Sequence, residues 1–198
     1  MTPQLLLAFI GYAFVTSITP GPNNTLLLAS GANHGFRASL PLLLGINLGF
    51  SGLVLAVGLG LGGLFSAIPV LHDILRYAGS AYLLYLAWKI ARSAPLEPGA
   101  EAAPPLSFPA AAAFQWVNPK AWIMAVGAVA AYTPTEGYFL NLAIVVIAYA
   151  LVNGPCIAVW AIGGTMLRGL LSDPARQRVF NVVMGLLLAA SLYPIVVS

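Results

Sequence analysis

Two short clusters of residues in this sequence could bind a ligand, and each lies inside a long apolar segment. The first cluster combines two prolines and a glycine with two asparagines: Thr19, Pro20, Gly21, Pro22, Asn23 and Asn24. Proline lacks a backbone N–H and clashes with the preceding helical turn, so we expect the helix to break here. Pro22 suits the first turn of a new helix, and the asparagines add hydrogen-bond donors and acceptors. Pro20 and Gly21 are expected to serve as a hinge.

The second cluster, Asn118-Pro119-Lys120, stands about a hundred residues later. Asn118 can cap a half-helix that begins at Pro119, which we expect to be a second hinge. Lys120 lies some ten residues from either end of its apolar segment. A charge at that depth in a membrane costs about 3 kcal/mol or more, so we expect Lys120 to face an internal cavity.

Helix N-termini and a lysine together favour an anionic ligand. A half-helix N-terminus carries positive partial charge, and Lys120 adds a full one. We therefore predict a carboxylate-binding site at Lys120 and Pro22, with hydrogen bonds from Thr19, Asn23, Asn24 and Asn118. No Asp or Glu lies in the core of an apolar segment, so a ligand ammonium would need neutral oxygens. A zwitterionic amino acid fits these groups better than a metal cation or a polyamine.

The elements that must position these residues are membrane helices. Of the 198 residues, 60% are hydrophobic and 7% are charged, which is too few charges for a soluble domain. A membrane-spanning helix needs about 20 mostly apolar residues. Six segments meet this length within a few residues: Leu5–Ala32, Leu40–Leu64, Val70–Ile90, Phe108–Ala131, Tyr138–Leu167 and Val179–Val197. We predict an all-α membrane protein with six spans, of which the first and fourth are broken.

The two halves of the chain resemble each other. The two breaks correspond, Gly45–Gly49 around Asn47 corresponds to Asn153–Pro155, and Gly79 corresponds to Gly185. Because each half has three spans, the second copy must be inverted, a pattern typical of transporters with a midplane site. We predict a single transmembrane domain over residues 1–198, with repeat one at 1–92, a polar loop at 93–105 and repeat two at 106–198.

Basic residues are concentrated in the loops after the first, third and fifth spans: Arg37, Lys89, Arg92, Arg168, Arg176 and Arg178. The positive-inside rule places these loops in the cytoplasm and both termini in the periplasm. The basic residues form no patch that would suit nucleic acid. Cys156 is the single cysteine, so the chain forms no internal disulfide.

These motifs resemble the LysE/RhtB family of amino-acid exporters over essentially the whole chain. The resemblance rests on residues 19–24 and 118–120, His34-Gly35-Phe36-Arg37, Gly45 with Gly49, Ala81-Tyr82-Leu83 and Ala87-Trp88-Lys89. Met1-Thr2-Pro3, residues 34–37 and residues 86–91 are similar to the cysteine/O-acetylserine exporter branch, whose members can have Val-Lys at positions 119–120. The resemblance implies an exporter in the bacterial inner membrane, often driven by the proton gradient.

We therefore expect a secondary-active exporter of small neutral amino acids or derivatives, working by alternating access. A channel or facilitator for small solutes is the first alternative, but it would need a continuous polar pore. A membrane-embedded enzyme is the second, although such enzymes cluster His, Cys, Asp or Glu. A structural or assembly protein is the third, but it would leave Lys120 without a role. We expect an amino acid and the lipid bilayer as partners, allow a homodimer, and expect no nucleic acid, cofactor or metal.

Overall fold

The computed structural model describes residues 1–61, 63, 70–93 and 104–192, with only the backbone for residues 71–76. All regular structure in these residues is helical, which confirms the predicted all-α class. The helices are α1 (Pro3–Ile18), α2 (Pro22–His34), α3 (Phe36–Ala56), η1 (Val57–Leu61), α5 (Val70–Ala91), α6 (Phe108–Gln115), α7 (Pro119–Tyr132), α8 (Tyr138–Leu167) and α9 (Pro174–Ala190). The expected spans at 40–64 and 179–197 end in residues outside the described ones.

Prolines mark where several helices begin. Pro3, Pro22, Pro119 and Pro174 each occupy the first helical position, where the missing N–H costs no helical bond. Side chains cap three of these four helices, and the fourth, α2, has Gly21 as its N-cap. The local sequence therefore sets these helix starts.

Both expected interruptions are present. Helices α1 and α2 are bent by 55° at the break between Ile18 and Pro22. Helices α6 and α7 are separated by residues 116–118. By contrast, α8 continues as one helix through Pro155, and α3 continues through Pro41.

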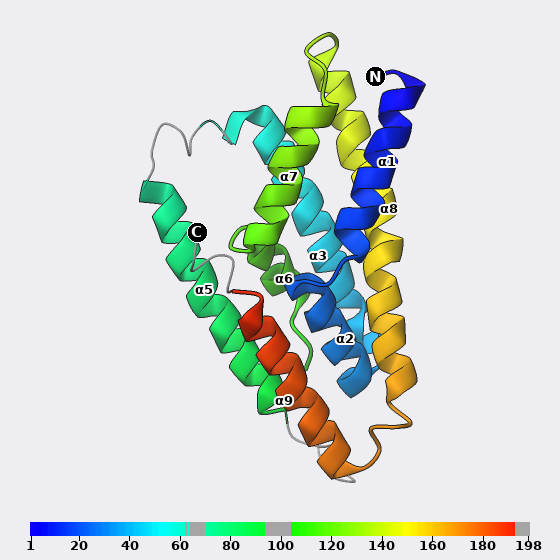
Figure 1. The fold of residues 1–198 in the computed structure, drawn as a ribbon, viewed down its shortest axis with the longest axis vertical. Coiled ribbons are helices and arrows are strands. Elements are labelled where there is room, and N and C mark those ends of the chain that lie inside the picture. Colours follow the sequence, from blue (N-terminus) through cyan, green and yellow to red (C-terminus); the bar gives the residue numbers. More distant parts are fainter. Residues whose placement is uncertain (62, 64–69, 94–103, 193–198) are drawn as a thin grey trace.

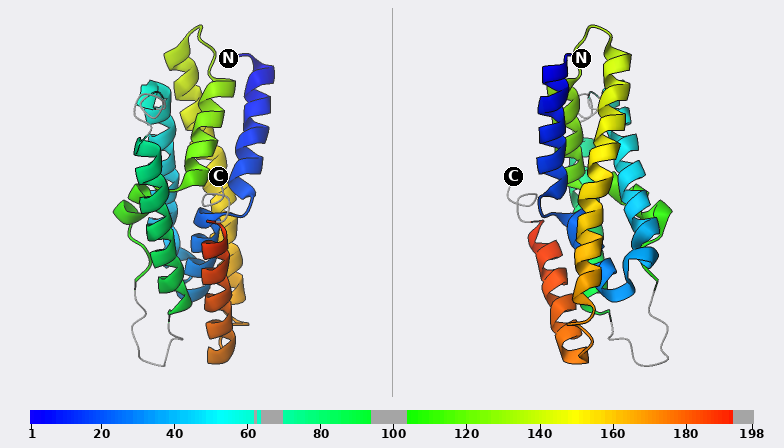
Figure 2. Two further views of the ribbon diagram at one scale, coloured as in Figure 1. Left: turned by 60° about the vertical axis from the view of Figure 1, so that its left-hand side comes forward. Right: turned by 90° about the vertical axis from the view of Figure 1, so that its right-hand side faces the viewer.

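The helices form an elongated bundle in which successive segments alternate in direction (Figure 1). Helices α1 and α2 descend from the N-terminal end, α3 ascends and α5 descends (Figure 1). Helix α7 then ascends, α8 descends and α9 ascends, as the turned views also show (Figure 2). Each later segment thus runs opposite to the segment about a hundred residues before it.

Two apolar cores lie at different heights in the bundle. The core that we call the upper core gathers side chains of α1, α3, α7 and α8 around Phe9, Phe50 and Tyr149. The lower core gathers side chains of α2, α3, α5, α6, α8 and α9 around Leu27, Ile46 and Phe114. The two helix breaks lie near mid-height in the bundle (Figure 1).

The outer surface carries many large apolar side chains. Met166 is 77% exposed, Phe139 is 74% and Leu151 is 70%, all on α8. In a water-soluble protein such a surface would cost free energy, whereas lipid is a matching solvent. By length and composition, Phe36–Leu61 and Tyr138–Leu167 can each cross a membrane, and the bent pair α1–α2 makes a third span if counted together. The division into six spans remains a prediction.

Candidate functional site

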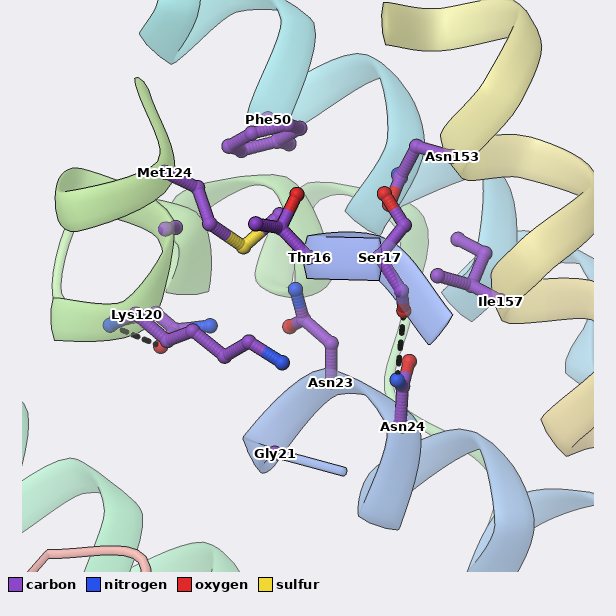
Figure 3. A pocket seen from close by; sticks show the side chains of 12 residues that line it. Thr16, Ser17, Gly21, Asn23, Asn24, Phe50, Lys120, Met124, Asn153 and Ile157 are labelled. Carbon is purple, nitrogen blue, oxygen red and sulfur yellow. Dashed lines mark hydrogen bonds between the residues drawn. The ribbon is translucent and has the colours of Figure 1, made fainter. Parts of the chain in front are cut away.

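A small cavity lies between the two apolar cores, where the two helix breaks meet. Its volume is about 20 Å³, counted as the space open to the centres of water molecules. That is enough for about one water molecule. The lining residues come from α1, α2, α3, α7 and α8 and from the two breaks: Thr16, Ser17, Gly21, Asn23, Asn24, Phe50, Asn118, Lys120, Ala121, Met124, Asn153 and Ile157. Figure 3 shows them.

Lys120 joins the two breaks. Its Nζ donates hydrogen bonds to the carbonyl oxygen of Thr19 at 2.8 Å, to Thr19 Oγ1 at 3.0 Å and to the carbonyl oxygen of Pro20 at 3.2 Å. These oxygens follow the C-terminal end of α1, where helix carbonyls carry negative partial charge. Among the described residues that line the cavity, Lys120 carries the one formal charge. Its three N–H groups all have partners within the protein.

Gly21 makes room for the lysine side chain. A Cβ atom at Gly21 would lie 2.8 Å from Lys120 Cδ and 3.1 Å from Nζ. The backbone of Gly21 is extended, so its glycine identity matters for space and not for conformation. The residue type in the first break is therefore matched to a side chain from the second.

Amide side chains hold the two half-helix starts. Asn23 and Gln115 exchange two hydrogen bonds, of 2.8 and 3.0 Å, so the start of α2 is tied to the end of α6. Asn118 caps α7, because its Oδ1 accepts from the backbone N–H of Lys120 at 3.2 Å. Both N-termini thus reach the same cavity, and each brings positive partial charge to it.

Asn24 fixes the end of α1. Its Nδ2 donates to the carbonyl oxygens of Ser17 and Thr19, both at 2.8 Å. The amide oxygen of Asn24 and the hydroxyl of Ser17 are buried and have no hydrogen-bond partner in the described part of the chain. Both residues line the cavity.

The wall opposite these residues comes from α3 and α8. Asn153 Nδ2 donates to Asn47 Oδ1 at 2.9 Å, which joins α8 to α3. On α1, the hydroxyl of Thr16 donates to the carbonyl oxygen of Tyr12. The same hydroxyl lies 2.7 Å from the side-chain hydroxyl of Tyr149. Phe50 and Met124 close the cavity on the side of the upper core, and Ile157 closes it on the side of the lower core.

The structure brings most of the predicted site residues together. Asn23, Asn24, Asn118 and Lys120 line the cavity, as does the expected hinge residue Gly21. The remaining predicted residues, Thr19, Pro20, Pro22 and Pro119, lie at the breaks but do not line it. Thr19 is exposed and meets Lys120 through its oxygens.

Sequence reasoning missed two polar residues, Ser17 and Gln115. Each is a polar side chain within one turn of a predicted break, and that position could have found them. The apolar lining residues Phe50, Met124 and Ile157 carried no such signal. Within the described residues, no group of three or more His, Cys, Asp or Glu side chains is placed to hold a metal ion.

Comparison with known proteins gives one consistent result. The model of the LysE type translocator family matches residues 14–190. A cysteine/O-acetylserine efflux protein of Escherichia coli K12 is 38% identical over 190 residues, covering 95% of each chain. The proteins of the same name from Shigella sonnei and from Escherichia coli O1:K1 are 38% and 37% identical over the same share. No solved structure matches the chain.

Proposed function

The chain belongs to the LysE family of translocators, and from this premise we propose that it exports small neutral amino acids or close derivatives across the bacterial inner membrane. The family match confirms the resemblance seen in the sequence motifs. The chain is thus a multi-pass membrane protein and an amino-acid exporter, not an enzyme. The substrates in the names of these relatives, cysteine and O-acetylserine, are small neutral amino acids, which supports this substrate class for the present chain.

One observation carries the proposal: two half-helix N-termini and a lysine ammonium converge on one small cavity. The first amides of α2 and α7 lack helical carbonyl partners, as at every helix start. Lys120 lies beside them, and none of the described lining residues has a carboxylate side chain. Positive charge at a buried site stabilises an anionic group, which in an amino acid is the carboxylate.

Lys120 binds the substrate carboxylate by exchanging partners. In the structure its ammonium contacts neutral oxygens of Thr19 and Pro20. A carboxylate is a stronger acceptor for an ammonium than a carbonyl oxygen is, because the hydrogen bond is then assisted by charge on both sides. Asn23 and Asn118, at the starts of α2 and α7, add hydrogen bonds to the substrate. Binding thereby loosens the contact between the two breaks and is coupled to movement at Pro20, Gly21 and Pro119.

Alternating access requires that the site open to one side of the membrane at a time. The upper and lower cores lie on opposite sides of the cavity, so each is suited to close one access route. The cavity has room for about one water molecule, while a cysteine molecule has seven heavy atoms. The cavity must therefore widen for substrate, and separation of either core from its neighbours would do this.

An inverted repeat provides the two equivalent routes. Helices α1–α2, α3 and α5 of repeat one run opposite to α6–α7, α8 and α9 of repeat two in the proposed arrangement of six spans. The observed directions of α2 and α7, of α3 and α8, and of α5 and α9 support it (Figure 1). Helix packing supports it too, since α3 packs on α6 as α8 packs on α1.

The charge distribution supports an orientation with the N-terminus in the periplasm. The last residues of α2, α5 and α8 lie at one end of the bundle (Figure 1). The basic residues Arg37, Lys89, Arg92 and Arg168 follow or end these helices. The positive-inside rule places that end in the cytoplasm.

Counter-flow in reconstituted vesicles tests the proposed function. Vesicles are loaded with an unlabelled amino acid and diluted into a solution that contains a trace of the same amino acid in labelled form. The amino acids tested include cysteine, O-acetylserine, serine and lysine. We expect saturable accumulation of label with small neutral amino acids. A channel would give equilibration without accumulation. No counter-flow with any amino acid in the panel would overturn the proposal.

A further inference from the structure

Two buried oxygen atoms at the cavity have unused hydrogen-bonding capacity. Ser17 is 3% exposed and Asn24 is 2% exposed, and both line the cavity. Within the described residues, neither Ser17 Oγ nor Asn24 Oδ1 has a hydrogen-bond partner. Buried polar atoms are paired in the great majority of cases, because desolvation without a partner costs free energy. Such atoms at a cavity indicate a ligand that donates hydrogen bonds.

The orientation of the Asn24 amide is fixed by its neighbours. Its Nδ2 donates to the carbonyl oxygens of Ser17 and Thr19, which can only accept. Turning the amide over would bring oxygen against oxygen at both contacts. Asn24 Oδ1 is therefore held as an acceptor, and Ser17 lies next to it (Figure 3).

The cavity is consequently divided by the type of its polar groups. Lys120 and the start of α2 bring positive charge and N–H donors to one part. Ser17 and Asn24 bring neutral oxygen acceptors to another part, separated from Lys120 in the view of Figure 3. The two parts are close, because the Thr19 carbonyl oxygen accepts from both Lys120 Nζ and Asn24 Nδ2. An α-amino acid has the same division, since its carboxylate and ammonium are attached to one carbon atom.

We propose that Ser17 Oγ and Asn24 Oδ1 form a subsite for the primary α-ammonium group of the substrate. This inference rests on the proposed function and adds the group that distinguishes an amino acid from a simple carboxylic acid. Two neutral acceptors fit an ammonium, which donates up to three hydrogen bonds. The two acceptors carry no charge, and a bound zwitterion adds no net charge. Lys120 therefore remains the one formal charge among the described residues that line the cavity.

Ser17→Ala is the sharpest test, because it removes one acceptor and leaves the bonds of Asn24 in place. The matched control is Ser51→Ala on α3, where the hydroxyl donates to the carbonyl oxygen of Asn47 and does not line the cavity. The ligand pair is L-cysteine and 3-mercaptopropionate, which differ by the ammonium group alone. Binding of each is followed on the purified full-length protein in detergent, from the rise of the melting temperature with ligand concentration, and by inhibition of cysteine counter-flow.

We expect Ser17→Ala to weaken cysteine binding roughly tenfold or more, as for the loss of a hydrogen bond to a charged group. The Ser17→Ala variant should bind 3-mercaptopropionate as the wild type does. If the wild type does not bind this compound, the variant should not bind it either. Ser51→Ala should bind both compounds as the wild type does. The melting temperature of unliganded Ser17→Ala should not fall, because Ser17 Oγ makes no hydrogen bond within the described residues.

Three results would overturn the inference. Unchanged cysteine binding in Ser17→Ala would mean that the two oxygens bind a structural water only. An equal loss for both compounds would mean that Ser17 shapes the cavity without contacting the ammonium. Equal wild-type affinity for cysteine and 3-mercaptopropionate would mean that no ammonium subsite exists. All three results presuppose a wild type that performs counter-flow, so they are distinct from failure of the proposed function.

Discussion

The side-chain ammonium of Lys120 lies 2.8 Å from the main-chain oxygen of Thr19, so two residues 101 positions apart join the two helix breaks. This contact places a positive charge at the C-terminal end of α1, where it stabilises the helix dipole. The same charge lies at the starts of α2 and α7, where a substrate carboxylate would bind. Lys120 is therefore a structural tie in this conformation and the proposed substrate ligand in another.

Lys120→Met should weaken substrate binding by about 2–4 kcal/mol, the range for losing one partner of a buried charge pair. The protein should still fold, but its melting temperature should fall by about 2–4 °C, as expected for about 1 kcal/mol in a chain of this size. Lys120→Arg should recover only part of the affinity, because a forked guanidinium does not replace a compact ammonium. Melting temperature and affinity are measured on the same purified protein.

Lys89→Met is the control for this prediction, because Lys89 is exposed in the last turn of α5. It should leave substrate affinity unchanged. A lowered melting temperature with unchanged affinity in Lys120→Met would restrict Lys120 to the structural tie.

Gly21→Ala should weaken substrate binding by about 1 kcal/mol, because the new methyl group would take the space that the Lys120 side chain occupies beside the starts of α2 and α7. In a Lys120→Ala background the same change should have little further effect, since the three atoms nearest to the new methyl group all belong to the Lys120 side chain. A double-mutant cycle on substrate affinity measures this coupling. Gly52→Ala is the control, as a Cβ there would meet no atom within 4 Å. Additive effects of Gly21→Ala and Lys120→Ala would contradict the prediction.

Replacement of Pro20, Gly21 and Pro22 by alanine should abolish export while the protein still inserts in the membrane. Alanine favours a helix by about 3 kcal/mol over each proline, so α1 and α2 should become continuous and lose their 55° bend. Export rate and the amount of membrane-inserted protein are measured together. Pro41→Ala is the control, because α3 passes through Pro41 without a break. Export at the wild-type rate by the triple variant would show that the break has no role in transport.

Single cysteines at the two ends of α8 should test the orientation. In a Cys156→Ser background, Thr135→Cys before α8 should react with an impermeant thiol reagent added outside intact cells. Ser172→Cys after α8 should react only once the membrane is permeabilised. Both positions are exposed, so a difference in labelling reports the side of the membrane. The reverse pattern would invert the proposed topology.

The sequence by itself determined the helical class and the positions of both helix breaks. Proline lacks an N–H and clashes with the preceding turn whatever surrounds it, so Pro22 and Pro119 start helices for local reasons. The scarcity of charge likewise indicated a membrane protein without knowledge of any contact. Depth along an apolar segment was enough to select Lys120 as a candidate ligand, although it did not identify the partners of its ammonium.

Only the tertiary structure decided which groups meet at the cavity. Three features depend on how helices are rotated and packed: the contact of Lys120 with Thr19, the pairing of Gln115 with Asn23, and the Ser17 oxygen that has no partner among the described residues. Gly21 illustrates the difference: its sequence context indicated a hinge, whereas its contact with the Lys120 side chain is a matter of space. Backbone preferences act within one turn, but contacts between residues about a hundred positions apart are set by the packing of all the helices together.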